Sequence, residues 1–369
     1  MNPLVPLADP LPQPAPPPLL WALLQLTFLL HTLAMNLVLG GSILALHFRA
    51  SRRAEEAVPR NQLLRTVEKA LPVAMAAAIT LGVAPLLFVQ VLYGRVFFTS
   101  SVLMGWFWLG LMPLLLAAYY GAYHLAFRPE PGPARRWTGT LVALALSAVA
   151  FLQVTNATRA LRPDSFSSAY RKDPRGLTLN LDDPTFWPRY LHLLLGAVAV
   201  AALAVALYGA LRRGREPELA RFAVRRGTAV FAAATAANVM VGLALLIAQP
   251  QPVLLRLVGG DRVSVSLLSV AILLAVALAG AAVLALGARQ PWPATPALAA
   301  LAAVTVAAML LLRDDLRRLV LHDAGLDPPS WVVAQWTPFG VFAVCLLLAV
   351  AAIAWMVRAL ATAGPAARE

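Results

Sequence analysis

The chain has 369 residues, of which 60% are hydrophobic and only 13% are charged, and its mean hydropathy is +0.74. So much apolar surface cannot be covered inside one water-soluble core, which excludes a wholly soluble protein. The formal net charge of +13 would point to nucleic acid in a soluble protein, but the arginines stand in short clusters between apolar segments, so we expect no nucleic-acid partner.

The chain opens with a proline-rich stretch, residues 1–18, which we expect to be an outer N-terminal tail without assigned structure. It lacks the basic start and the cleavage site of a secretory signal, so the first apolar segment is expected to stay as an anchor. Crossing a bilayer as a helix takes about 20 apolar residues. Segments of that length stand at 19–47, 70–93, 102–127, 137–158, 188–211, 227–248, 264–288, 294–313 and 332–357.

Basic clusters set the expected orientation of these nine segments. They follow the first, third and fifth segments, and such clusters mark the cytoplasmic side. The N-terminus is therefore expected outside and the C-terminus in the cytoplasm, with 159–187, 249–263 and 314–331 as outer connections. The sequence thus predicts an all-α protein of about nine transmembrane helices in the bacterial inner membrane, with a transmembrane domain over 19–358 and a cytoplasmic tail over 359–369.

Histidines are almost the only ionisable groups inside the predicted spans, and such groups mark functional sites in a membrane. A transporter coupled to protons or ions would be expected to keep a buried charge on its pathway, so transport is disfavoured. His31 lies near the middle of the first span and His192 in the outer part of the fifth. Small residues follow both on the same helical face, which suits a flat macrocycle beside an axial imidazole. The alternative is that each histidine only forms hydrogen bonds between helices.

The single cysteine, Cys345, narrows the cofactors that the chain could hold. One cysteine excludes an internal disulfide, heme attached through a Cys-x-x-Cys-His motif and an iron–sulfur cluster bound by cysteines. Any cofactor must therefore be bound by histidine, methionine or carboxylate side chains.

Three stretches of the sequence share their pattern with one known family. Residues 26–40 (LTFLLHTLAMNLVLG), residues 78–94 and residues 188–196 (PRYLHLLLG) resemble the first, second and fifth helices of subunit I of the cytochrome bd-type quinol oxidases. The resemblance implies that His31 corresponds to the ligand of a high-spin heme b and His192 to the ligand of a low-spin heme b near the outer face. The likeness is strongest over 19–250.

The sequence departs from that family at the residues of oxygen chemistry. Where the family's third helix carries two glutamates at the oxygen-reducing heme and its proton path, this chain has Ser101 and Leu109. The methionine that completes the low-spin site has no equivalent in residues 265–288, and the Gly-Arg-x-Pro-Trp motif after the eighth helix is missing. Asp314 with Arg317 is the nearest counterpart of the family's heme-ligating glutamate and arginine.

The resemblance and the departures together imply a membrane subunit that holds one or two b-type hemes and passes electrons without reducing oxygen. It would belong to a quinol-linked oxidoreductase, with a c-type cytochrome or another respiratory subunit as its partner. The family's quinol loop is shortened here to about residues 249–263, and Gln249, Gln251 and Arg256 are its candidate quinol-binding residues. Two other interpretations stay open, namely a heme-free structural or assembly subunit and, less favoured, a small-solute transporter.

Overall fold

The computed structural model describes residues 12–51, 54–128, 132–288 and 292–362. Within these residues nine helices are long and apolar enough to cross a membrane, and no β-strand is formed. The predicted all-α, multi-pass architecture is therefore confirmed. The nine helices are α1 (Pro17–Ala50), α2 (Ala57–Leu103), α3 (Gly105–Phe127), α4 (Pro133–Ala160), α6 (Phe186–Arg212), α7 (Pro217–Ile247), α9 (Arg262–Gly287), α10 (Ala294–Asp323) and α11 (Trp336–Thr362).

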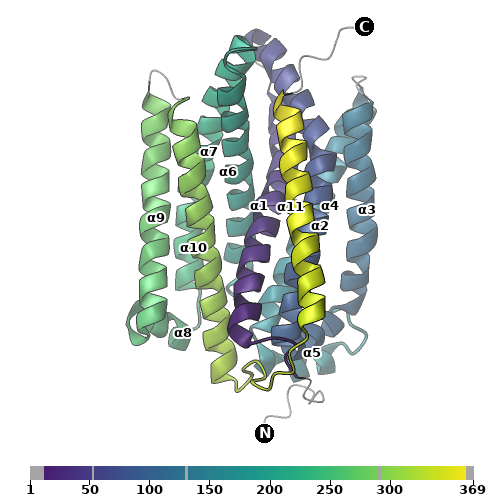
Figure 1. The fold of residues 1–369 in the computed structure, drawn as a ribbon, viewed down its shortest axis with the longest axis vertical. Coiled ribbons are helices and arrows are strands. Elements are labelled where there is room, and N and C mark those ends of the chain that lie inside the picture. Colours follow the sequence, from purple (N-terminus) through teal and green to yellow (C-terminus); the bar gives the residue numbers. More distant parts are fainter. Residues whose placement is uncertain (1–11, 52–53, 129–131, 289–291, 363–369) are drawn as a thin grey trace.

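Two helix pairs form the centre of the bundle, whose helices stand side by side along the long axis of the molecule (Figure 1). Helix α1 packs along α2, α6 packs along α7, and α1 also packs against α6. Helices α3 and α4 pack on each other and on α2, whereas α9 contacts α7 and α10. Helix α11 makes few contacts, and its most apolar stretch leaves no residue buried inside the protein. The outward faces of the helices are apolar, as a lipid solvent requires.

Glycines let the central helices approach closely. A Cβ at Gly40 on α1 would lie 1.9 Å from the backbone oxygen of Ala197 on α6. A Cβ at Gly227 on α7 would lie 2.7 Å from the backbone oxygen of Ala202 on α6. Small residues at crossings are the usual means of packing membrane helices, because lipid removes the hydrophobic drive between them.

An ion triad ties three helices together at the end of the bundle where α1 ends. Glu68 of α2 accepts hydrogen bonds from Arg49 of α1 and Arg135 of α4. The three side chains are 1%, 11% and 14% exposed, respectively. A carboxylate this deeply buried is tolerated because two guanidinium groups neutralise it.

Several helices extend beyond their predicted limits, and α2 and α10 are two clear cases. Helix α2 starts well before residue 70 and reaches Leu103, with a kink at Tyr93 (φ −128°, ψ 28°), so that only Met104 separates it from α3. Helix α10 continues to Asp323, although the sequence predicts a loop over 314–331. The charged residues that end the apolar run do not end the helix, because Asp314 and Arg317 lie one turn apart and pair at 3.0 Å.

Two of the predicted connections, 159–187 and 249–263, contain short helices at the end of the bundle where α1 begins (Figure 1). The first holds a 3₁₀ turn, η2 (Pro163–Ser165), and α5 (Phe166–Lys172). The second holds α8 (Gln251–Leu255) and a π-helical turn, η3 (Arg256–Gly260).

The described part of the proline-rich N-terminal stretch contacts the segment that precedes α11. The backbone N–H of Gln13 donates to the oxygen of Trp331 at 2.7 Å, and the N–H of Val333 donates to the oxygen of Gln13 at 2.9 Å. The remainder of the predicted tails, residues 1–11 and 363–369, lies outside the described residues.

Candidate functional site

The ring of His31 projects from α1 against α2. Its Nδ1 lies 2.9 Å from the backbone oxygen of Ala78, which can only accept, so in the neutral ring Nδ1 carries the proton. A Cβ at Gly82, one turn further along α2, would lie 2.8 Å from Cε1 of the ring, so the absence of a side chain makes room for the imidazole. The unprotonated nitrogen is therefore Nε2, and an imidazole held in this way is prepared to bind a metal ion.

The ring of His192 projects from α6 against α7. A Cβ at Gly242 would lie 3.2 Å from Cε1 of this ring. The backbone carbonyl of Asn238, one turn before Gly242, interacts with the imidazole, but Nδ1 is buried without a well-formed hydrogen bond among the described residues. This histidine therefore has an incompletely satisfied buried nitrogen, which is costly unless a further group completes the site.

The surroundings of the two histidines repeat from one helix pair to the other. In each pair the histidine lies on the first helix, while the second helix offers a backbone carbonyl, from Ala78 or Asn238, and then a glycine one turn later. The sequence shows no internal repeat because the shared features are carbonyls and glycines, which leave no pattern of side chains to compare.

A cluster of arginines lies among the helices that carry the histidines, and we refer to Arg189, Arg313 and Arg317 as the arginine cluster. Arg313 of α10 stacks over the ring of Phe28 at 4.4 Å, and Phe28 in turn contacts the ring of His31, with 6.2 Å between ring centroids. Arg317 stacks over Tyr93 at 4.9 Å. The three guanidinium groups are close enough to repel one another.

Two carboxylates, Asp183 and Asp314, interact with the three guanidinium groups of the arginine cluster, which leaves one positive charge in excess. Asp314, which is 1% exposed, accepts from Arg317 at 3.0 Å and from the indole N–H of Trp21. Nε of Arg189 is buried without a hydrogen-bond partner in the described part of the chain. An excess of partly buried positive charge is costly and indicates that an anionic group belongs nearby.

The arginine cluster was not recognised from the sequence. Arg189 and Arg313 stand at the ends of the predicted spans 188–211 and 294–313, where a charge is expected to reach water, and Arg317 falls in the predicted loop after residue 313 although α10 continues through it. The signal that could have found them was their spacing, since Arg313 and Arg317 stand four residues apart and so lie on one helical face. The interior of the bundle therefore does carry charge, and a transporter is not disfavoured on that ground.

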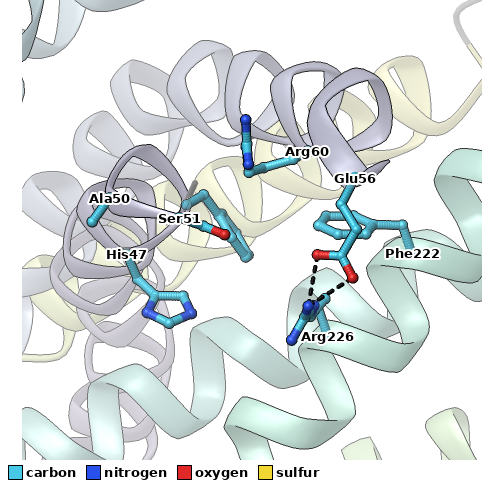
Figure 2. Close-up of a pocket in the computed structure, with 8 residues that line it drawn as sticks. His47, Ala50, Ser51, Glu56, Arg60, Phe222 and Arg226 are labelled. Atoms are coloured by element: carbon cyan, nitrogen blue, oxygen red, sulfur yellow. Dashed lines mark hydrogen bonds and ion pairs between the residues drawn. The ribbon is translucent and has the colours of Figure 1, made fainter. Parts of the chain in front are cut away.

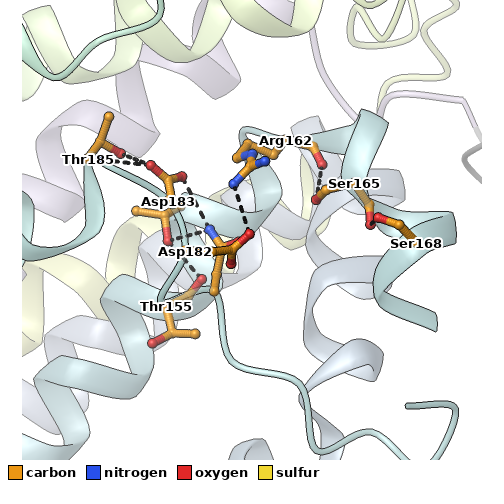
Figure 3. A network of polar contacts seen from close by, with 9 residues as sticks. Thr155, Arg162, Ser165, Ser168, Asp182, Asp183 and Thr185 are labelled. Atoms are coloured by element: carbon orange, nitrogen blue, oxygen red, sulfur yellow. Dashed lines mark hydrogen bonds and ion pairs between the residues drawn. The ribbon is translucent and has the colours of Figure 1, made fainter. Parts of the chain in front are cut away.

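A polar network fixes the start of α6, the helix of Arg189 and His192 (Figure 3). Asp183 accepts from the backbone N–H and the hydroxyl of Thr185, both at 2.7 Å, and from the amide of Asn180 at 3.2 Å. The same amide donates to the hydroxyl of Thr158 on α4 at 3.1 Å. The network therefore ties the first turn of α6 to the last turn of α4, which limits how far α6 can rotate.

Comparison with known proteins identifies the fold. No protein-family model and no curated protein matches the sequence. Among solved structures, the bd oxidase from Geobacillus thermodenitrificans matches with a TM-score of 0.73 over 95% of this chain and 99% of that chain, at 16% sequence identity. The chain has the bd oxidase fold. The resemblance predicted from the sequence is confirmed at this level, and nine apolar helices with this fold make the chain a multi-pass protein of the bacterial inner membrane.

The positions of the expected bd oxidase glutamates are neutral and apart from each other. Ser101 lies in the last turn of α2, not in α3, and its hydroxyl accepts a 3.0 Å hydrogen bond from the amide of Asn156 on α4. Ser100 donates to the same amide group at 3.3 Å. Leu109 lies on α3 and is 67% exposed on the outer surface of the bundle. The buried Ser–Asn network therefore replaces a carboxylate with groups that carry no charge at neutral pH.

The three candidate quinol-binding residues of this bd-like fold stand at the end of α7 and in the short helices that follow. The amide of Gln249 donates to the backbone oxygen of Leu245 at 3.0 Å, and Gln251 is exposed. Arg256 pairs with Asp323 at the end of α10, at 2.9 Å. Two of the three side chains thus already have partners elsewhere in the protein, and these contacts do not join the three described residues into one site.

Proposed function

We propose that the chain is a heme b-binding membrane subunit that transfers electrons between the quinone pool and a respiratory partner, and is not itself an oxygen-reducing terminal oxidase. The observation that carries the proposal is the orientation of His31. Its Nδ1 is engaged by the Ala78 oxygen at 2.9 Å, so Nε2 keeps its lone pair inside an apolar bundle. This is the arrangement that axial imidazole ligands use in proteins.

The rest of the site fits the same cofactor. His192 occupies the equivalent place in the second helix pair, and glycines leave room beside both rings. The arginine cluster would supply positive charge to the carboxylates of a porphyrin, and Nε of Arg189 has no hydrogen-bond partner among the described residues. Within the described residues, no three His, Cys, Asp or Glu side chains come together as they would to bind a metal ion. A heme therefore fits these histidines better than a metal ion bound by side chains alone. A bound heme b would supply reversible one-electron chemistry.

The neutral surroundings of Ser101 support a role other than oxygen reduction. Reduction of oxygen consumes protons, and their delivery through a dry interior generally uses carboxylates. Ser101 and Asn156 bond to each other and carry no titrating proton. We therefore place the chain between quinol and a partner such as a c-type cytochrome, with Gln249, Gln251 and Arg256 at the quinol side.

The experiment is an optical one on the protein purified from a host with ample heme supply. The dithionite-reduced minus oxidised spectrum should show a b-type alpha band, which His31→Ala and His192→Ala should each reduce. His322→Ala is the matched control, because His322 is exposed and pairs with Asp327 away from both helix pairs. Vesicles holding the purified chain should consume no oxygen when quinol is added.

Two results would favour the other interpretations. A colourless wild-type protein of normal stability would indicate a heme-free structural or assembly subunit. The packing of α1 on α6 would then hold the bundle together without a cofactor. Solute uptake into liposomes that does not depend on heme supply would indicate a transporter that uses the arginine cluster.

A further inference from the structure

A cavity of about 290 Å³ opens at the end of the bundle where α1 ends, far along the helices from the arginine cluster. Its walls come from the last turn of α1, from the segment that leads into α2, and from α7 (Figure 2). The lining residues are His47, Phe48, Ala50, Ser51, Glu56, Arg60, Phe222 and Arg226. None of these residues belongs to the candidate heme site.

Positive charge exceeds negative charge in this cavity. Arg60 and Arg226 contribute two guanidinium groups against the one carboxylate of Glu56. Nη2 of Arg226 donates to both oxygens of that carboxylate, at 2.7 and 2.6 Å, which fixes the guanidinium at the cavity wall (Figure 2). The C-terminus of α1 brings about half a negative charge, which is smaller than the net charge of the side chains. The cavity is therefore suited to an anion.

The chemistry of the walls selects the kind of anion. His47 and Ser51 add hydrogen-bonding groups beside the arginines, whereas Phe48 and Phe222 add apolar surface. The volume stands at the lower end of ligand sites and suits a headgroup rather than a whole lipid. An anion that is also partly apolar fits such walls better than a fully hydrated ion does.

The cavity lies at the level of lipid headgroups. Helix α1 ends at Ala50 and α7 begins at Pro217, so the cavity stands where the apolar parts of these helices meet water. Arginines surround it, and basic pockets between membrane helices at this level bind anionic headgroups. The arginines of this end include Arg49, Arg60, Arg65, Arg212, Arg213, Arg215, Arg221, Arg225 and Arg226.

We infer that this cavity binds the phosphate headgroup of an anionic phospholipid. The phosphodiester lies against Arg60 and Arg226, and the glycerol portion lies against Phe48 and Phe222. The lipid bridges α1, the start of α2, and α7, and so joins the two central helix pairs from the membrane surface.

The experiment titrates the detergent-solubilised full chain with dioleoylphosphatidylglycerol and counts bound lipids by native mass spectrometry. Wild type should retain one phosphatidylglycerol more tightly than the others and should not retain dioleoylphosphatidylcholine in the same way. Arg226→Gln should weaken that binding about tenfold, because a hydrogen bond to a charged group is lost. Arg225→Gln is the matched control, since Arg225 is the exposed neighbour on the same helix and does not line the cavity.

A second variant covers the case in which Arg226→Gln does not fold, since it also breaks the pair with Glu56. Arg60→Gln should weaken phosphatidylglycerol binding similarly, while Arg226→Lys should restore most of it. Equal weakening by Arg225→Gln would show that only general surface charge attracts the lipid, and the inference would then be wrong. Displacement of the lipid by millimolar inorganic phosphate would assign the cavity to free phosphate and would likewise overturn it.

Discussion

Nδ1 of His31 lies 2.9 Å from the backbone oxygen of Ala78, so a carbonyl of α2 orients the imidazole that α1 carries. A backbone acceptor cannot change its protonation state, so it holds one tautomer of the ring at any pH at which the ring is neutral. The space for this ring comes from Gly82, whose Cβ would lie 2.8 Å from Cε1 of the imidazole.

Gly82→Ala should therefore reduce the b-type alpha band. The added methyl group displaces the ring from the Ala78 oxygen and removes the preference for a free Nε2. The loss should approach the loss caused by His31→Ala, measured in the same reduced-minus-oxidised spectra. Gly110→Ala is the control, because a Cβ there meets nothing within 4 Å. An unchanged band in Gly82→Ala, with a normal band in the control, would argue against iron ligation by His31.

Gly40→Ala should destabilise the whole bundle. A Cβ at this position would lie 1.9 Å from the Ala197 oxygen, and neither backbone can move without separating α1 from α6. Overpacking of this kind costs about 1–3 kcal/mol or more. Thermal melting, monitored by size-exclusion chromatography, should show a clear fall in the Tm of Gly40→Ala. The Tm of Gly105→Ala should not fall, because a Cβ at Gly105 has open space around it. Equal melting of the two variants would mean that the helices can part at no cost.

Glu68→Gln should be the most harmful single change at the end of the bundle where α1 ends. It leaves Arg49 and Arg135 largely buried without the carboxylate that neutralises both, and breaking a buried pair in this way costs about 3 kcal/mol or more. The yield of folded protein and its Tm should both fall. Glu55→Gln removes the same charge from an exposed site and should change the free energy of unfolding by less than about 0.5 kcal/mol. Similar Tm values for the two variants would show that the triad contributes little.

Asp261 should make stability depend on pH at the start of α9. Its carboxylate accepts from the backbone N–H of Ser264 at 2.9 Å, and this hydrogen bond lowers the pKa of Asp261 below its usual value. A lowered pKa in the folded state means that the contribution is present above about pH 4 and is lost as the pH falls through the folded pKa. The Tm difference between wild type and Asp261→Ala should therefore shrink between pH 6 and pH 3. A difference that stays constant over this range would contradict the role of the ionised carboxylate.

The fold could be predicted from the sequence because lipid imposes a simple rule. Each apolar run must close its own hydrogen bonds, so runs of sufficient length become helices, and all nine predicted spans appear among the described residues. Helix ends were predicted less well. Charged residues lower hydropathy but do not break helices, so α10 continues through Asp314 and Arg317 to Asp323.

The candidate site could be predicted only in part. His31 and His192 stand out because histidine is rare within apolar runs, and both rings lie between paired helices. The contacts of His31 with the Ala78 carbonyl and with Gly82 depend on how α1 and α2 pack. A local sequence pattern does not predict that packing. The place of Arg313 could not be predicted because its partner Phe28 is far away in the sequence, although the Phe28 ring lies 4.4 Å from the guanidinium in the fold.

The approach of Gly40 to the Ala197 oxygen also bears on how charge would travel through the protein. It joins the helix of His31 to the helix of His192 through main-chain atoms, and main chain packed this tightly cannot slide. Redox centres held by these two helices would keep a constant tunnelling distance throughout turnover. The rate of electron exchange between them would then respond to their reduction potentials and not to a motion that changes their separation.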